Sequence, residues 1–182
     1  RRRFDALGLF AVNLMSSPGA GKTSLLERTV DGLAGRFRMA VIEGDLQTSN
    51  DAERILKKGV QAVQINTDGG CHLDGNVGNL VCPAEFNLGE HEKVTILSVT
   101  EGDDKPAKYP LMFQISSILI VNKIDLLPYI DCDIEKIRSH ARQLNPNQNI
   151  FEVSCRTGEG LESWLSWLES KVAEKRKDRA RS

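Results

Sequence analysis

The chain has 182 residues, of which 24 are lysine or arginine and 25 are aspartate or glutamate, so its formal net charge is −1. This length fits one domain, and we expect residues 1–182 to share a single core. The balanced charge gives no basic field for nucleic acid, and no apolar run approaches the roughly 20 residues that span a bilayer. Because no signal-peptide pattern follows the arginine-rich start, we expect a cytoplasmic protein without a membrane or nucleic-acid partner.

Short apolar runs alternate with helical patterns along the chain. We expect strands at residues 10–15, 39–42, 61–65, 94–99, 117–121 and 150–153. We expect helices at residues 23–33, 52–58, 133–144 and 161–173, followed by a charged, frayed tail at 174–182. This alternation is typical of an α/β domain and predicts a three-layer sandwich, with a mostly parallel central sheet and helices on both faces. Ligand-binding loops then lie at the carboxyl ends of the strands.

A glycine-rich segment, SSPGAGKT at residues 16–23, lies between the first expected strand and the first expected helix. A P-loop requires this setting, because small residues let backbone N–H groups surround phosphates at a helix N-terminus. We expect Lys22 to act on the β- and γ-phosphates in a catalytic role and Thr23 to bind Mg²⁺. Ser16 replaces the usual first glycine of a P-loop, and it is small. The expected nucleotide-binding residues here are Pro18, Gly19, Ala20, Gly21, Lys22, Thr23 and Ser24.

The motif N-K-x-D follows the expected strand at residues 117–121 and is the signature of GTPases. A carboxylate at Asp125 can accept hydrogen bonds from N1–H and from the 2-amino group of guanine, a donor pair that adenine lacks. Lys123, next to Asn122, can cover the face of the base with its aliphatic stem. These three residues therefore predict selective binding of GTP and GDP.

A third segment, at Ser154, Cys155 and Arg156, resembles the S-A-K loop that offers a backbone N–H to guanine O6. Cysteine and arginine replace alanine and lysine, and both changes should be tolerated because the contact comes from the backbone. The P-loop, the N-K-x-D motif and this loop follow in the order expected of a GTPase, each at the end of a strand.

Acidic residues end the second expected strand, at Glu43 and Asp45. We choose Asp45 as the catalytic acid that is linked to Mg²⁺ or positions water, and we rank Glu43 lower. Ordinary acidic residues in a turn before a helix would give the same sequence, so both interpretations stay open.

The adjacent residues Cys71 and His72 are followed ten residues later by Cys82. Thiolate and imidazole are ligands for Zn²⁺ or Ni²⁺. Three ligands leave a tetrahedral site incomplete, and symmetric pairing of two chains could complete or double it. Spacing alone leaves open the alternative of a core cysteine beside an exposed histidine.

Taken together, these segments resemble the HypB family of hydrogenase nickel-insertion GTPases, which belong to the SIMIBI class of P-loop proteins. The matching stretches are residues 16–23, 43–45, 47–54, 70–74, 76–86 and 122–125. The resemblance implies slow GTP hydrolysis, Cys71, His72 and Cys82 as metal ligands, and a homodimer in the GTP-bound state. It also implies a hydrogenase-maturation partner protein and the hydrogenase large subunit as partners.

The sequence departs from this family between Asp74 and Asn76, which only Gly75 separates. The family normally has a helix and a strand here, and such a crossover needs on the order of twenty residues. We therefore expect a further segment between about residues 74 and 76, with Gly78 as the glycine that senses the γ-phosphate. The chain has no histidine-rich or cysteine-rich N-terminal tail, so a nickel-storage role is not expected.

The favoured hypothesis is a GTP-hydrolysing nickel metallochaperone for [NiFe]-hydrogenase, working through a GTP-dependent dimer switch. One alternative is a urease-type nickel GTPase with the same chemistry. Another is a regulatory GTPase without metal delivery. A small-molecule kinase with a similar P-loop is disfavoured by the N-K-x-D motif.

Overall fold

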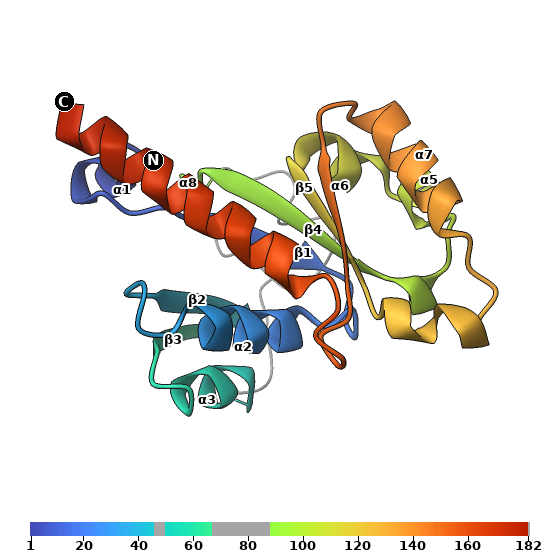
Figure 1. The fold of residues 1–182 in the computed structure, drawn as a ribbon, viewed down its shortest axis with the longest axis horizontal. Coiled ribbons are helices and arrows are strands. Elements are labelled where there is room, and N and C mark those ends of the chain that lie inside the picture. The colour runs from blue at the N-terminus through green and yellow to red at the C-terminus, as the bar shows by residue number, and fades with distance from the viewer. Residues whose placement is uncertain (46–49, 67–87, 182) are drawn as a thin grey trace.

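The computed structural model describes residues 1–45, 50–66 and 88–181, with side chains described except at 43–45, 50–52, 64–66 and 179–181. The strands in these ranges are β1 (Val12–Ser16), β2 (Ala40–Asp45), β3 (Gln61–Asn66), β4 (Glu92–Ser98), β5 (Ile118–Asn122) and β6 (Asn149–Val153). The α-helices are α1 (Arg2–Leu7), α2 (Lys22–Leu33), α3 (Asn50–Leu56), α5 (Lys105–Lys108), α6 (Pro110–Ile115), α7 (Ile134–Leu144) and α8 (Leu161–Arg181) (Figure 1). Two 3-10 helices, η1 (Val99–Glu101) and η2 (Ile124–Tyr129), follow β4 and β5.

The described strands form a four-stranded sheet of order β1-β4-β5-β6 and a two-stranded sheet of β2 and β3. All pairings are parallel. In the larger sheet Asn122 lies opposite both Ser98 and Val153, so the carboxyl ends of β4, β5 and β6 meet at one edge. This arrangement confirms the predicted α/β class with a mostly parallel sheet.

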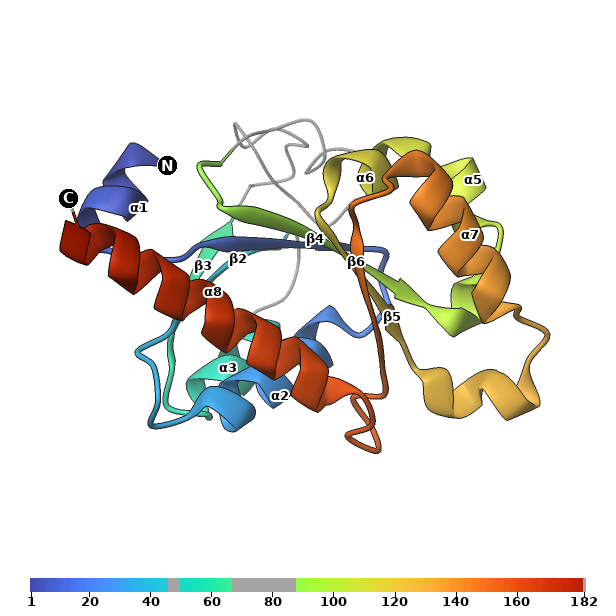
Figure 2. The same cartoon turned by 45° about the horizontal axis from the view of Figure 1, so that its top comes forward.

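Helices cover both faces of the four-stranded sheet, with α2 and α8 on one side and α6 and α7 on the other (Figure 2). Successive residues of a strand point to opposite faces of the sheet, so their side chains pack into two separate hydrophobic cores. The core on the α2 and α8 side includes Leu25, Ile96, Ile120 and Trp164. The core on the α6 and α7 side includes Leu97, Phe113, Val121 and Ile137. Every residue of β5 is buried, as expected for a central parallel strand covered on both faces.

The β2–β3 pair is covered on one face by α2 and α3. The packed residues there include Val30, Val41, Ile55 and Ala62. On the opposite face Ile42 and Val63 lie in register with each other, and they remain 68% and 58% exposed. Among the described strands, β1 pairs with β4 alone and β2 with β3 alone. Within the described residues, β1 is therefore an edge strand of the larger sheet, and the smaller sheet has an exposed apolar pair.

The C-terminal helix is longer than the sequence predicted. Helix α8 continues to Arg181, whereas we expected it to end at residue 173 and to be followed by a frayed tail. Two lysines of its C-terminal half have acidic partners: Lys171 pairs with Glu174 at 3.0 Å, and Lys175 pairs with Asp5. Helices α1, α5 and α6 were not predicted, since their 4 to 6 residues are too few to show a periodic pattern.

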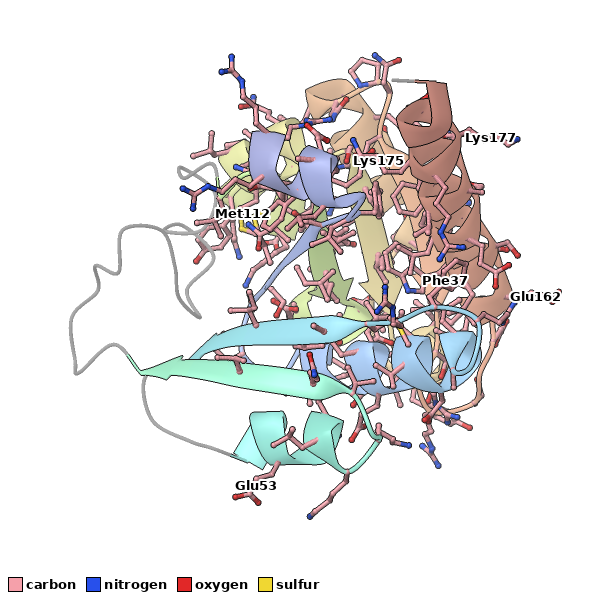
Figure 3. All side chains as sticks on the ribbon, turned by 90° about the vertical axis from the view of Figure 1, so that its left-hand side faces the viewer. Phe37, Glu53, Met112, Glu162, Lys175 and Lys177 are labelled. Atoms are coloured by element: carbon pink, nitrogen blue, oxygen red, sulfur yellow. The ribbon has the colours of Figure 1, made fainter. Side chains whose placement is uncertain are left out.

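Helix α1 is attached to the rest of the domain by Asp5. Its Oδ1 accepts hydrogen bonds from Nζ of Lys175 and, at 3.0 Å, from Nε2 of His91. Lys175 lies where α8 passes α1 (Figure 3). Nδ1 of His91 accepts the N–H of Ala11 at 3.0 Å, so the ring hydrogen belongs on Nε2. The hydrogen bonds from Lys175 and His91 lower the pKa of Asp5 from 3.8 to about 2.

This lowered pKa predicts an acid-dependent contribution of Asp5 to stability. A carboxyl group whose pKa falls on folding stabilises the fold above its unfolded pKa, and this contribution is lost as the pH falls through the folded pKa. We expect wild type to have a higher Tm than Asp5→Asn at about pH 5, and the difference to shrink towards zero near pH 2. Thermal unfolding followed by circular dichroism at each pH measures this difference in Tm. A difference that stays constant over this range would contradict the assignment.

Candidate nucleotide-binding site

The loop between β1 and α2 depends on two glycines with left-handed backbone. Gly19 and Gly21 have φ values of 79° and 97°. A Cβ at Gly21 would lie 2.3 Å from Nδ2 of Asn122, whereas the same atom at Gly19 would meet nothing within 4 Å. Gly21 is therefore required by a close approach as well as by its backbone angle, and Gly19 by its backbone angle alone.

The N-terminus of α2 lies directly after this loop. The 12-residue helix begins at Lys22, so the N–H groups of its first turn have no partners within the helix and carry the positive end of its dipole. Thr23 is buried at this point. Oγ of Ser17 is also buried and has no hydrogen-bond partner among the described residues. A buried hydroxyl donor beside a helix N-terminus fits a phosphate oxygen as its acceptor.

Asn122, at the end of β5, joins the P-loop to the loop that follows β6. Its Nδ2 donates to the carbonyl oxygen of Ala20 at 2.9 Å. Its Oδ1 accepts from the N–H of Lys123 at 2.8 Å and from the N–H of Cys155 at 3.3 Å. The side chain is 1% exposed. In this structure Asn122 thus connects the two loops.

Lys123 makes a second connection to the P-loop. Its Nζ donates to the carbonyl oxygen of Gly19 at 2.8 Å. Lys123 has a φ of 65° and is the one non-glycine residue with positive φ in the described part of the chain. That backbone conformation costs about 1 kcal/mol in a residue with a side chain, and it directs the lysine across the loop.

Asp125 keeps acceptor capacity for a ligand. One carboxylate oxygen, Oδ1, accepts from Oγ of Ser154 at 2.6 Å. The other, Oδ2, lies 3.9 Å from the guanidinium of Arg156, which is too far for a hydrogen bond. The side chain is 14% exposed, and Oδ2 accepts no hydrogen bond from the described residues, so it can accept one from a ligand.

The loop after β6 is folded on Ser154. Its Oγ accepts the N–H of Thr157 at 3.1 Å, and its carbonyl oxygen accepts the N–H of Gly158 at 2.9 Å. Burial raises the pKa of the Cys155 thiol to about 11, so this cysteine is a neutral packing residue. The contact from the backbone N–H of this loop to guanine O6 stays a prediction.

The structure gathers one group of the predicted site residues and leaves another outside the description. Those connected by the contacts above are Gly19, Ala20, Asn122, Lys123, Asp125, Ser154, Cys155 and Arg156. Pro18, Gly21, Lys22, Thr23 and Ser24 occupy the same loop and the first turn of α2. Asp45 ends β2, but its side chain is outside the description. Cys71, His72, Gly78 and Cys82 lie outside the described residues, as does the short join at 74–76.

Sequence reasoning missed one residue at this site. Arg28 of α2 donates from Nε to the carbonyl oxygen of Cys155 at 2.7 Å and from its terminal nitrogen to that of Arg156 at 3.1 Å. No motif marks an arginine on a helix surface, and its partners are backbone atoms more than 120 residues away. Within the described ranges, no group of three histidine, cysteine or acidic side chains is placed to hold a metal ion. No described helix has the length and apolar character to cross a membrane.

Comparison with known proteins identifies the family. Residues 10–81 and 76–152 match the nucleotide-binding domain of the CobW/HypB/UreG family. The hydrogenase maturation factor HypB of Azotobacter vinelandii is 53% identical over 93% of this chain, and that of Escherichia coli K12 is 49% identical over 93%. The chain spans 63% and 66% of the lengths of these two relatives.

Solved structures agree with this assignment. The crystal structure of the hydrogenase maturation factor HypB from Archaeoglobus fulgidus has a TM-score of 0.86 and 34% identity, and the match covers 94% of each chain. The structure of HypB from Helicobacter pylori in complex with nickel has a TM-score of 0.88 and 38% identity, covering 95% of this chain and 91% of that one. The chain therefore belongs to the CobW/HypB/UreG family of nucleotide-binding proteins, and within it to the HypB group.

Proposed function

We propose that this protein is a slow GTPase of the cytoplasm that acts as a nickel metallochaperone for [NiFe]-hydrogenase. The observation that carries the proposal is the connection of the P-loop to the expected base-reading residues through Asn122 and Lys123, because a site for GTP needs these two segments side by side. The names of the relatives support the hydrogenase client, and the nickel complex of the Helicobacter pylori protein supports the metal.

In this proposal the nucleotide lies across the loops that the contacts join. The phosphates of GTP are held at the N-terminus of α2, where Lys22 neutralises charge on the β- and γ-phosphates. Asp125 accepts hydrogen bonds from the N1–H and 2-amino groups of guanine, and the loop at 154–156 donates to O6. Mg²⁺, when bound through Thr23 and Asp45, supplies further neutralisation of the phosphate charge.

The metal-binding half of the proposal depends on Cys71, His72 and Cys82 as ligands for Ni²⁺ or Zn²⁺. Gly78 lies between these ligands in the sequence and is the proposed sensor of the γ-phosphate. Nucleotide state and metal affinity can then be coupled, provided that the GTP-bound and GDP-bound states differ in affinity for the metal. A GTP-dependent homodimer, a maturation partner and the hydrogenase large subunit complete the proposal.

Guanine selectivity can be tested at Asp125. Asp125→Asn removes an acceptor for the 2-amino group and introduces an amide that can donate to the C2 carbonyl of xanthine. We expect affinity for GDP to fall at least tenfold, since a hydrogen bond to a charged carboxylate is lost. Affinity for xanthosine diphosphate should rise, since the side-chain amide donates a new hydrogen bond to the base. Calorimetric titration measures both constants, with Asp131→Asn at an exposed position as the control. If Asp125→Asn binds GDP as tightly as wild type, the carboxylate does not read the base.

The metallochaperone role can be tested by binding Ni²⁺ and Zn²⁺ to protein loaded with GDP or with a non-hydrolysable GTP analogue. We expect the analogue to produce a dimer and to change the nickel affinity several-fold, and Cys71→Ala to abolish tight binding. Equilibrium dialysis with light scattering reports both quantities. GTP binding without metal binding in either state would favour a regulatory GTPase. The name of the Helicobacter pylori relative, a hydrogenase/urease maturation factor, keeps the urease-type alternative in view.

We also propose that the complete domain contains a further helix and strand between about residues 74 and 76. This sequence does not include them. Four observations support it. In the described part of the chain, β1 pairs with β4 alone and so has an edge that one more parallel strand can extend, and the exposed pair Ile42 and Val63 can be covered by one more helix. The family match divides into two stretches, residues 10–81 and 76–152, which overlap at residues 76–81. The alignment with the Azotobacter vinelandii protein extends over 190 residues, more than the 182 of this chain, so that relative has residues without a counterpart here.

An insertion tests this proposal directly. The residues of the Azotobacter vinelandii relative that have no counterpart here are identified by aligning the two sequences and placed after Asp74, and a Gly/Ser-rich segment of equal length serves as control. Covering Ile42 and Val63 should contribute about 2 kcal/mol, which raises the Tm by roughly 4–8 °C for a domain of this size. Calorimetry measures the Tm, and hydrogen exchange measures protection of the β1 amides. Equal Tm values for the two insertions would refute it.

A further inference from the structure

We propose that Arg28 is a positioning residue for guanine recognition. Through its two hydrogen bonds it orients the peptide between Cys155 and Arg156, so that the N–H of Arg156 is presented to guanine O6. The proposal rests on the guanine-nucleotide function proposed above, and it names the residue that holds one of the base contacts in place.

The backbone N–H groups of the loop identify the donor. Four of the five at residues 155–159 have acceptors at 2.9 to 3.3 Å. These acceptors are Asn122 Oδ1, Ser154 Oγ, the carbonyl oxygen of Ser154 and Thr157 Oγ1. The N–H of Arg156 is the one left without an acceptor among the described residues. It is therefore the donor that this loop has available for a ligand.

Arg28 holds the other side of the same peptide group. Its Nε donates to the carbonyl oxygen of Cys155 at 2.7 Å, and its terminal nitrogen donates to that of Arg156 at 3.1 Å. The described chain has no cis peptide bonds, and in a trans peptide the C=O and the following N–H point in opposite directions. Fixing the carbonyl of Cys155 towards α2 thus turns the free N–H of Arg156 away from α2. The rigid fork of the guanidinium suits this role, because two donors grip consecutive carbonyls.

The same helix serves the other end of the nucleotide. Arg28 lies five residues after Thr23, so one α-helix begins at the phosphate loop and grips the base-reading loop. The neighbouring residue Thr29 accepts a hydrogen bond from Nε1 of Trp164 at 2.9 Å, which keeps α2 beside the start of α8. On the other side of the loop, Ser154 holds Asp125 at 2.6 Å. The available N–H and the carboxylate are thereby attached to one short segment.

The test compares Arg28→Gln and Arg28→Lys with wild type, using three diphosphates as ligands. 6-Thioguanosine diphosphate carries a weakly accepting sulfur in place of O6, and inosine diphosphate lacks the 2-amino group that Asp125 reads. We expect Arg28→Gln to lower GDP affinity about fivefold and to reduce the preference for GDP over the thio analogue. The preference for GDP over inosine diphosphate should stay at the wild-type value. Lysine has a single ammonium group in place of the planar guanidinium with its several donors. The GDP affinity of Arg28→Lys should therefore lie between those of wild type and Arg28→Gln.

The control is Arg36→Gln, which makes the same chemical change just beyond α2, where Arg36 pairs with Glu169 and does not reach the loop. It should leave all three affinities unchanged. If both Arg28 variants keep the full preference for GDP over the thio analogue, Arg28 does not orient the O6 contact and the proposal is overturned. A wild-type chain that binds ADP as well as GDP would instead overturn the proposed function itself.

Discussion

The site depends on one buried amide. Asn122 is 1% exposed, and its two polar atoms bond to the carbonyl of Ala20 and to the N–H of Cys155. Leaving a buried polar atom unsatisfied costs about 1–3 kcal/mol, so any movement of either loop away from Asn122 is opposed. The approach is close enough that residue 21 has room only for glycine, since a Cβ there would lie 2.3 Å from the amide nitrogen. The P-loop and the loop after β6 are consequently fixed relative to each other by contacts within the protein.

The parallel sheet makes this connection possible. Registers between β4, β5 and β6 bring their carboxyl ends to one edge, which is where residues about 100 positions apart can meet. Apolar residues feed cores on both faces, so β5 is held from each side and Asn122 at its end has little freedom. Lys123 then adopts a left-handed backbone conformation that is unfavourable for lysine. Its hydrogen bond to the carbonyl oxygen of Gly19 is a second connection to the P-loop. Burial in the sheet thus sets the geometry of the polar site.

Most of the strands and site residues could be predicted from the sequence. The features that could not be predicted depend on contacts between residues far apart in the chain. Apolar runs located all six described strands, and the P-loop and N-K-x-D motifs located most residues of the contact network, because both signals are local. Helix α1 was missed because it is too short to show a periodic pattern, and both α1 and the C-terminal part of α8 are held by the pairing of Asp5 with Lys175, which lie 170 residues apart. Arg28 was missed because its partners are carbonyl groups that any residue could supply. Side chains that bond to distant backbone leave no pattern in a sequence.

The fold also separates two parts of the proposed activity. The P-loop, Asn122, Asp125 and the loop at 154–156 all follow strands of the four-stranded sheet or belong to its covering helix α2. Asp45 ends β2 in the smaller sheet, whose apolar pair Ile42 and Val63 is exposed. In the proposed function, guanine recognition would therefore draw on the part of the molecule with both faces packed. The proposed role of Asp45 would draw on the part with an uncovered face, so we expect hydrolysis to depend on the completeness of the sheet more than nucleotide binding does.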